Sequence, residues 1–177
     1  MSLRRYREKR DFTRTPEPRA RIARSVAQPP RFVVQKHAAS TLHYDFRLEI
    51  DGVLKSWAIP KEPSLDPTQK RLAVHTEDHP LDYAQFEGEI PQRQYGAGLM
   101  QIWDEGTWVP EGAALANYRR GQMKFELKGR RLKGHWALVR MGNAQTRKKD
   151  LWLLIKREPM QEKPRAPRRD APGEARR

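Results

Sequence analysis

The chain has 177 residues, which is long enough for one domain with a hydrophobic core and too short for two domains of ordinary size. It carries 36 Lys and Arg against 22 Asp and Glu, so its formal net charge is +14, and it contains no cysteine. The lack of cysteine excludes disulfides, a thiol nucleophile and thiolate zinc fingers. No apolar run approaches the roughly 20 residues that span a bilayer, and no signal-peptide core follows the basic start, so we expect a cytoplasmic protein without membrane contact.

Positive charge is concentrated at the two ends of the chain. Residues 1–31 hold ten Lys and Arg against three Asp and Glu, and residues 161–177 hold six against three, so the segment 32–160 keeps only four of the fourteen net charges. Basic arms of this kind usually contact phosphate backbones, which makes nucleic acid the expected partner. For residues 161–177, a Pro-, Arg- and Ala-rich tail, we expect disorder, and a solvated tail that only aids solubility explains it equally well.

Residues 1–31 are predicted to form an irregular basic arm. They include Pro16, Pro18, Pro29 and Pro30 and show no long apolar pattern. From charge patterning alone, we expect the acidic and basic residues of this arm to form a solvated cluster.

Two strands are predicted next, from Arg31 to Lys36 and from Leu42 to Ile50, joined by a connector over residues 38–41. The second strand, LHYDFRLEI, alternates apolar and polar residues without a fault. Its apolar members are expected to pack in a core. The polar members, which share the opposite face, are His43, Asp45, Arg47 and Glu49.

A metal site is the sharpest prediction from this pair of strands. If the connector lets His37 stand opposite His43, the two imidazoles are cross-strand neighbours and Asp45 lies one step further along the same face. Two His and one carboxylate leave coordination positions open, as catalytic metal sites do, and this set accepts Mn²⁺, Zn²⁺, Fe²⁺ or Co²⁺. Arg47 on that face can grip phosphate oxygens with its forked donors. The alternative is that these side chains merely decorate a solvated strand face.

The rest of the chain predicts more short strands. Asp51-Gly52 is a hairpin signal before a strand over Val53–Ile59, and another strand is predicted over Lys70–Thr76. Strands over Leu99–Trp103 and Thr107–Val109 are predicted to form a hairpin around the sequence DEG, and MKFELKG, GHWALVRM and DLWLLIKR supply later strands. One short helix is expected within residues 111–120. Many short strands with few helices indicate an all-β sandwich or barrel.

The segments QKHAASTLHYDFRLEIDGVLKSWAIPKEPSLDP, RLAVHTEDHPLDYAQFEGEIP and YGAGLMQIWDEGTW closely resemble the 3′-phosphoesterase domain of bacterial DNA ligase D. The resemblance runs from about Tyr6 to Lys156. It implies a single β-barrel domain over residues 32–160, preceded by an arm over residues 1–31 that contributes to the active site. It also implies a Mn²⁺-dependent enzyme of DNA end joining that removes 3′-phosphates and 3′-terminal ribonucleotides to leave a 3′-hydroxyl; Co²⁺ and Zn²⁺ are the alternative metals.

The same resemblance assigns site residues that sequence patterns alone do not. His79 and Tyr83 carry over from HTEDHPLDY, where a lone His-Pro turn and a Tyr would otherwise be interpreted as structural. His79, with a reference pKa near neutrality, is expected to donate a hydrogen bond to the phosphoryl group or to protonate the leaving oxygen. This chain departs from the family in having Gln92-Arg93-Gln94 where a Gly is common. The resemblance also implicates Arg10, Asp11 and Glu17 of the arm, and Arg71 is a further candidate phosphate ligand. With Arg47 from the strand face, the residues expected to act besides the metal ligands are Arg10, Asp11, Glu17, Arg47, Arg71, His79 and Tyr83.

Two other functions compete with the phosphoesterase. Two His and one carboxylate on a barrel also describe the non-haem Fe(II) oxygenases, although the lone His of those enzymes commonly lies far downstream of the His-x-Asp pair. A non-catalytic nucleic-acid binder, in which His37, His43 and Asp45 hold no metal, is the third hypothesis. The expected partners are DNA or DNA/RNA 3′ ends, a separate ligase or polymerase and a Ku-type end-binding protein, and we expect a monomer.

Overall fold

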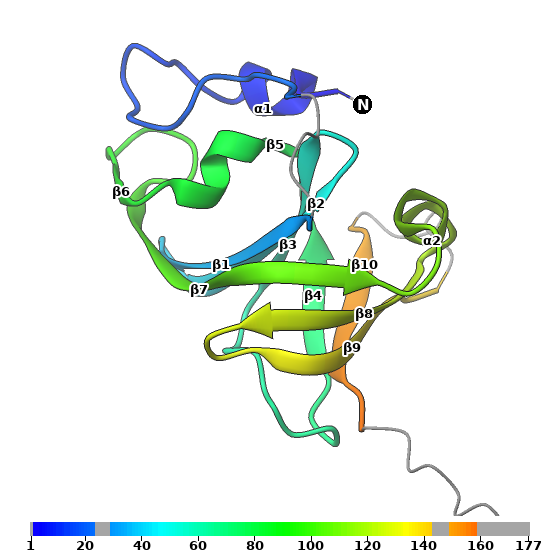
Figure 1. Ribbon diagram of the computed structural model, residues 1–177. Helices are drawn as coiled ribbons and strands as arrows, with labels where there is room; N and C mark the ends of the chain where they lie inside the picture. The colour runs from blue at the N-terminus through cyan, green and yellow to red at the C-terminus, as the bar shows by residue number, and fades with distance from the viewer. Residues whose placement is uncertain (1, 24–28, 143–148, 159–177) are drawn as a thin grey trace, which may run out of the picture.

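A computed structural model describes residues 2–23, 29–142 and 149–158. The strands in these residues are β1 (Arg31–Ala38), β2 (Leu42–Ile50), β3 (Val53–Ile59), β4 (Arg71–His75), β5 (His79–Pro80), β6 (Gly88–Ile90), β7 (Gly98–Pro110), β8 (Gln122–Gly129), β9 (Lys133–Arg140) and β10 (Leu151–Lys156). The helical segments are α1 (Arg4–Glu8), the 3-10 turn η1 (Leu81–Gln85) and α2 (Ala114–Arg120). Figure 1 shows their arrangement.

The strands form one antiparallel sheet that closes on itself. The order runs β1-β2-β3-β4-β10-β9-β8-β7, and β7 pairs with β1, so eight strands of the described residues make a closed barrel. The short strand β5 adds to β3, and β6 adds to β7. The expected all-β barrel of short antiparallel strands is therefore confirmed. Closure pairs the strand edges that an open sheet would leave free.

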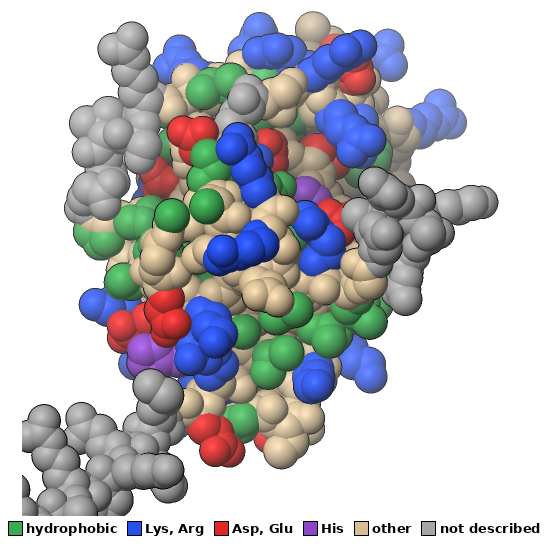
Figure 2. Space-filling model, turned by 90° about the vertical axis from the view of Figure 1, so that its right-hand side faces the viewer, with side chains coloured by type: hydrophobic (Ala, Val, Ile, Leu, Met, Phe, Trp, Pro, Cys, Tyr) green, Lys and Arg blue, Asp and Glu red, His purple; other side chains and the backbone are tan. Residues whose placement is uncertain are grey.

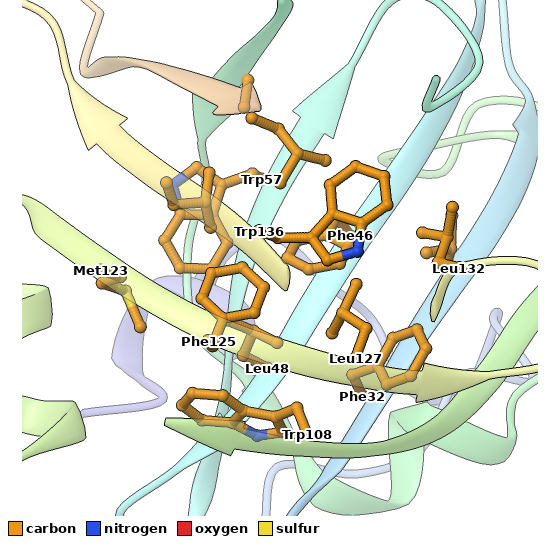
Figure 3. Close-up of a cluster of buried hydrophobic side chains, with 14 of the residues drawn as sticks. Phe32, Phe46, Leu48, Trp57, Trp108, Met123, Phe125, Leu127, Leu132 and Trp136 are labelled. Carbon is orange, nitrogen blue, oxygen red and sulfur yellow. The ribbon is translucent and has the colours of Figure 1, made fainter. Parts of the chain in front are cut away.

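The barrel interior is filled by the apolar side chains that alternate along the strands. Phe46 and Leu48 of β2 are fully buried there, and Trp57 of β3 and Phe125 of β8 pack around Phe46. Figure 3 shows this cluster between the opposed strands. The period-two pattern of LHYDFRLEI thus predicts the inward face of β2 correctly, except that Leu42 at its start is exposed.

The polar face of β2 is buried as well, which the interpretation as a solvated face did not anticipate. Asp45, Arg47 and Glu49 are all less than a tenth exposed. A second apolar cluster covers this side of the sheet, and it combines Leu3 and Tyr6 of the N-terminal arm with residues of β3, η1 and β7. In Figure 1 the arm lies over β5 and η1. The arm was expected to be wholly irregular, but it contains α1 and it packs on the barrel instead of being solvated.

The predicted hairpin around Asp104-Glu105-Gly106 is wrong, because β7 runs without a turn from Gly98 to Pro110. The carboxylate of Asp104 accepts hydrogen bonds from the backbone N–H groups of Arg130, Arg131 and Leu132 at 2.8, 3.2 and 2.8 Å, so it holds the β8–β9 turn. A Cβ on Gly106 would lie 2.1 Å from the carbonyl oxygen of Lys128. Gly106, which suggested a turn in the sequence, instead allows β7 to approach β8 closely.

Two further elements follow the sequence patterns, whereas β5, η1 and β6 were not expected. Asp51 and Gly52 take positive φ values of 52° and 81° and join β2 to β3 as a tight hairpin. The expected helix of residues 111–120 is the shorter α2, which ends at Gly121 with φ 77°. In the described part of the chain no helix is long and apolar enough to cross a membrane. The predicted tail over 161–177 lies outside the described residues.

Candidate active site

The β1–β2 pairing brings two imidazoles and a carboxylate together. His37 is directly opposite His43, and Gln35 is opposite Asp45. His37 Nδ1 lies 3.2 Å from His43 Nε2, and Asp45 Oδ2 lies 3.5 Å from the first nitrogen and 3.3 Å from the second. The three side chains predicted to share a face therefore converge on one point.

Both imidazoles are oriented by backbone carbonyl groups. His37 Nε2 donates to the Gly96 carbonyl oxygen at 2.7 Å, and His43 Nδ1 donates to the Thr41 carbonyl oxygen at 3.0 Å. When each ring gives its one proton to its carbonyl, as a metal-bound imidazole does, His37 Nδ1 and His43 Nε2 present their lone pairs to a cation. Metal-binding histidines are commonly held in this way by a carbonyl on the second nitrogen.

The donor set fits a divalent cation. Donors bound to a tetrahedral cation at zinc-like distances are about 3.4 Å apart, and the three separations here are 3.2, 3.3 and 3.5 Å. Because only three protein atoms converge, further coordination positions stay open to water or substrate.

The carboxylate of Asp45 is suited to stay ionised although it is buried. Burial alone would raise its pKa, but the charge of Arg47 and the hydrogen bonds from His37 and His43 outweigh burial, and the pKa of Asp45 lies well below its usual range. The Arg47 Nη2 atom is 3.6 Å from Asp45 Oδ2. Asp45 is therefore available as an anionic ligand at any physiological pH.

A cavity of about 290 Å³ opens beside this cluster. Its lining includes the three candidate ligands and side chains from the arm, from β2, from the segment after β4 and from the loop between β6 and β7. The polar groups that it adds to the cluster are Arg10, Arg47, Glu77, His79, Tyr83 and Tyr95.

The guanidinium of Arg47 is fixed on one side by a hydrogen bond, and one of its nitrogens has no partner among the described residues. Its Nε donates to Gln35 Oε1 at 2.7 Å, and Gln35 in turn donates to the carbonyl oxygens of Tyr83 and Phe86 at 2.7 and 3.0 Å. The Arg47 Nη1 atom is buried and has no hydrogen-bond partner among the described residues. An unsatisfied buried guanidinium is costly unless a ligand completes it, so this atom points to an anionic group bound in the cavity.

The arm reaches the site through Arg10 and Glu17. Arg10 Nε donates to Glu17 Oε2 at 2.9 Å, and the Tyr83 hydroxyl donates to the same oxygen at 2.7 Å. Arg10 Nη1 also lies 3.3 Å from Glu77 Oε1, and both groups are almost fully buried. These contacts fix the arm against η1 and place the Arg10 charge in the cavity lining. Tyr83, whose pKa is raised well above its ordinary value chiefly by burial, stays protonated.

His79 is a neutral imidazole in the folded protein. Its Nδ1 donates to the Glu77 carbonyl oxygen at 2.9 Å, so Nε2 carries the lone pair. Burial first, and then the charges of Arg47 and Arg10, lower its pKa well below the ordinary value. In the folded protein without substrate, the pKa of His79 therefore lies well below the reference value near neutrality.

Two of the residues that the resemblance implicates lie away from the cavity. The carboxylate of Asp11 accepts hydrogen bonds from the backbone and hydroxyl of Thr13 and is exposed. Arg71 donates to the Glu62 carbonyl oxygen and to the Gln69 side chain, in a separate hollow beside Trp103. These contacts do not bring Asp11 into the cavity as a member of the active site, nor Arg71 as a phosphate ligand.

Several lining or supporting residues were not singled out from the sequence as functional. Glu77 and Lys9 form an ion pair of 3.0 Å at the rim, and Tyr95 lines the cavity from the β6–β7 loop. Glu77 lies within the motif HTEDHPLDY, which was a usable signal. Lys9 and Tyr95 come from the distant segments YREKRD and QYGAG, so only the fold brings them together.

The fold and the site define an all-β barrel domain with a candidate cation site in a cavity that two arginines also line. The family model of the DNA ligase D 3′-phosphoesterase domain matches residues 35–140. The chain therefore belongs to the DNA ligase D 3′-phosphoesterase domain family.

Relatives of the chain are long proteins. The multifunctional non-homologous end joining protein LigD of Pseudomonas aeruginosa is 53% identical over 152 residues, which cover 85% of this chain and 18% of that protein. The multifunctional non-homologous end joining DNA repair protein LigD of Mycobacterium tuberculosis is 45% identical over 151 residues, and that match covers 85% of this chain and 19% of that protein. The LigD of Mycolicibacterium smegmatis is 43% identical over 154 residues. The chain thus spans 18–19% of the length of these relatives.

We predict that Mn²⁺ stabilises the wild-type protein through the three converging ligands. At a concentration of 100 times the dissociation constant a cation adds about 2.7 kcal/mol to the free energy of unfolding, which raises Tm by about 5–10 °C in a protein of this size. Thermal unfolding with Mn²⁺ and with EDTA measures this shift. Asp45→Ala should lose it, whereas His79→Ala, a change in the same cavity outside the ligand set, should keep it. An equal shift in Asp45→Ala would show that the cation binds elsewhere.

Stability should also depend on pH through His79. Because its folded pKa is depressed, the unfolded chain binds a proton below pH of about 6.5 that the folded protein does not bind, so stability falls as pH falls, by at most about 1.4 kcal/mol per pH unit. His79→Asn keeps a donor for the Glu77 carbonyl oxygen and removes the titration. Urea unfolding at several pH values below 6.5, in EDTA, should give a shallower loss for this variant than for wild type. Parallel curves for the two proteins would contradict the neutral state of His79.

Proposed function

We propose that this protein is a metal-dependent phosphoesterase that processes DNA 3′ ends, removing 3′-phosphates and 3′-terminal ribonucleotides to leave a 3′-hydroxyl. The observation that carries the proposal is that Arg47, whose Nη1 is buried and has no partner among the described residues, lines the same cavity as the cluster of two imidazoles and a carboxylate. The curated relatives are end-joining proteins by name, which supports DNA ends as the substrate. Water adds to phosphorus and the bond to the 3′ oxygen breaks.

His37, His43 and Asp45 are the proposed ligands of the cation. When bound, a divalent cation neutralises negative charge on a phosphate oxygen and orients the group for attack. Mn²⁺ is the proposed metal by the family resemblance, and the donor set also suits Co²⁺ and Zn²⁺. The chain supplies the orientation of these ligands, because Gly96 and Thr41 fix both imidazoles.

The guanidinium groups of Arg47 and Arg10 are proposed to hold the remaining phosphate oxygens. Both line the cavity, and Arg47 is immobilised by Gln35, so its free edge keeps one direction. Preorganised donors of this kind stabilise the charge that develops on the phosphoryl oxygens in the transition state. Tyr83, whose hydroxyl donates to Glu17, keeps the arm and thereby Arg10 in place.

His79 is proposed to move the proton to the leaving oxygen. In the protein alone it is neutral, because the two arginines and burial disfavour its charge. A bound phosphate offsets those positive charges and raises the pKa of His79, and a phosphomonoester brings a proton of its own since its second pKa is about 6. That proton, held on Nε2, can then pass to the 3′ oxygen as its bond to phosphorus breaks.

Contact with the DNA backbone is assigned to the basic arm. Arg4, Arg5 and Arg7 of α1 are exposed, and Figure 2 shows Lys and Arg side chains gathered at the upper end of the molecule, where the arm lies in Figure 1. Such charge gives sequence-independent affinity for phosphates. A separate ligase or polymerase and a Ku-type end-binding protein are proposed partners of a monomeric protein.

The phosphoesterase accounts for the site better than the two alternatives. An oxygenase would share the two His and the carboxylate, but it would have no use for two buried guanidinium groups in the cavity. A non-catalytic binder whose His and Asp residues decorate a solvated face conflicts with the burial of His37 and Asp45, which are 5% and 6% exposed.

The decisive test is an assay on a labelled primer-template that ends in a 3′-phosphate or in one terminal ribonucleotide. With Mn²⁺ we expect a 3′-hydroxyl product, and none with EDTA. Asp45→Ala should abolish the activity and still unfold cooperatively, since the carboxylate faces a cavity instead of the core. If wild type made no 3′-hydroxyl product from either end with any of the divalent cations, the proposed function would be wrong.

Arg47→Lys should reduce the rate far more than it weakens substrate binding. Lysine keeps the charge but loses the fork, which should cost about 2–4 kcal/mol in the barrier, as removal of one transition-state donor does. Single-turnover rates at saturating substrate measure this effect. Arg131→Lys is the matched control, because Arg131 lies over Trp103 in a different hollow. A rate within a factor of two of wild type for Arg47→Lys would remove Arg47 from the reaction.

A further inference from the structure

Tyr95 is the one large aromatic side chain of the described residues that is prominently exposed. Its exposed fraction is 48%, whereas Trp57, Trp108, Trp136 and Trp152 are at most 1% exposed. The residue lies in the loop between β6 and β7 and lines the cavity that contains the cation ligands. An exposed aromatic ring at the mouth of a charged cavity has no role in the core of the protein.

The loop that carries this ring is anchored to the cation site. The carbonyl oxygen of the next residue, Gly96, accepts the 2.7 Å hydrogen bond from His37 Nε2. The loop is closed by hydrogen bonds from Gln94 N to the Pro91 carbonyl oxygen and from Ala97 N to the Gln94 carbonyl oxygen, both of 3.1 Å. Tyr95 therefore stays at a fixed position relative to the point where a phosphate would bind.

The ring itself is held from one side by the arm. Lys9 Nζ lies 4.6 Å from the ring centroid and donates to the Tyr95 hydroxyl at 3.3 Å, while the same ammonium group pairs with Glu77. The Arg10 guanidinium carbon lies 5.4 Å from the ring centroid. Cations hold aromatic rings in this way through the negative face of the ring. Since Tyr95 remains 48% exposed, it still offers area to a flat partner.

Apolar side chains also line the cavity. Ile90 and Met100 are among them, and an ideal Cβ on Gly96, the residue after Tyr95, would lie 3.8 Å from Ile90 Cδ1 and 3.6 Å from His37 Cε1. The cavity thus joins a charged part, suited to the phosphate, to an apolar and aromatic part, suited to the flat group attached to that phosphate. On a DNA end this group is a nucleobase.

We propose that Tyr95 stacks on the nucleobase next to the scissile 3′-phosphate and thereby positions the terminal nucleotide. The inference rests on the proposed function and deepens it. A stacking contact accepts every base, because each base has a π face, so Tyr95 selects a nucleotide end without selecting a sequence. Tyr95 is a positioning residue, since it acts on the base and not on the phosphate.

The test compares two primer-templates that both carry a 3′-phosphate, one on a normal terminal nucleotide and one on an abasic deoxyribose. Wild type should prefer the base-bearing end by about 10- to 100-fold in kcat/KM, mainly through KM, as expected for one base–aromatic stack. In Tyr95→Ala and Tyr95→Leu this ratio should fall toward one, whereas Tyr95→Phe, which lacks only the hydroxyl, should keep it. The Leu variant preserves apolar volume, so it separates stacking from mere bulk.

A binding measurement in EDTA separates this inference from the proposed function. A primer-template with 2-aminopurine as its 3′-terminal base should lose fluorescence on binding wild type and Tyr95→Phe, and lose much less on binding Tyr95→Leu. Quenching that depends on Tyr95 in a protein without phosphoesterase activity would uphold the stacking and overturn the proposed reaction. An active wild type with the same substrate ratio and the same quenching as Tyr95→Leu would overturn the stacking alone.

Discussion

The register between β1 and β2 is the constraint on which the rest of the site depends. Because side chains alternate along a strand, a shift of one residue would turn His43, Asp45 and Arg47 into the barrel and Phe46 out of it. Both edges of β1 oppose such a shift, since β1 is paired with β2 on one edge and with β7 on the other. Gly98 of β7 fits against β1 so closely that a Cβ would lie 2.1 Å from the Ala38 carbonyl oxygen. Barrel closure therefore fixes His37 opposite His43.

A layer of buried charges surrounds the cation ligands, and nearly every member is paired. Arg10 is matched with Glu17 and Glu77, and Asp45 lies beside Arg47. Burial of a charge is costly unless other charges and hydrogen bonds compensate it, and removal of one partner leaves the other uncompensated. The exception is the Nη1 edge of Arg47. Paired groups hold the guanidinium of Arg47 in place, so its unpartnered nitrogen is preorganised for a ligand.

The arm supplies the cover that makes this burial possible. Leu3 and Tyr6 are fully buried against the barrel, and the Tyr6 hydroxyl donates to the Pro18 carbonyl oxygen. Lys9 and Arg10 follow directly and reach the rim and the lining of the cavity. In the β6–β7 loop, Arg93 takes a φ of 71°, in the left-handed region that favours glycine. This backbone state is costly for arginine, and the loop retains it while it carries Tyr95.

The sequence by itself determined the two faces of β2, and it placed His43, Asp45 and Arg47 on one of them, because side chains alternate along a strand with a period of two residues. It also determined the hairpin at Asp51 and Gly52, because these residues favour a tight turn. It also determined the basic character of the arm. Only the tertiary structure decided that the polar face is covered, that Asp11 and Arg71 lie away from the cavity and that Lys9 and Tyr95 meet at its rim. Only the tertiary structure made His79 neutral, through burial beside two arginines that come from distant segments. The physical reason is that periodicity fixes the direction of a side chain relative to its own strand, whereas burial and electrostatic fields depend on what other parts of the chain pack against it.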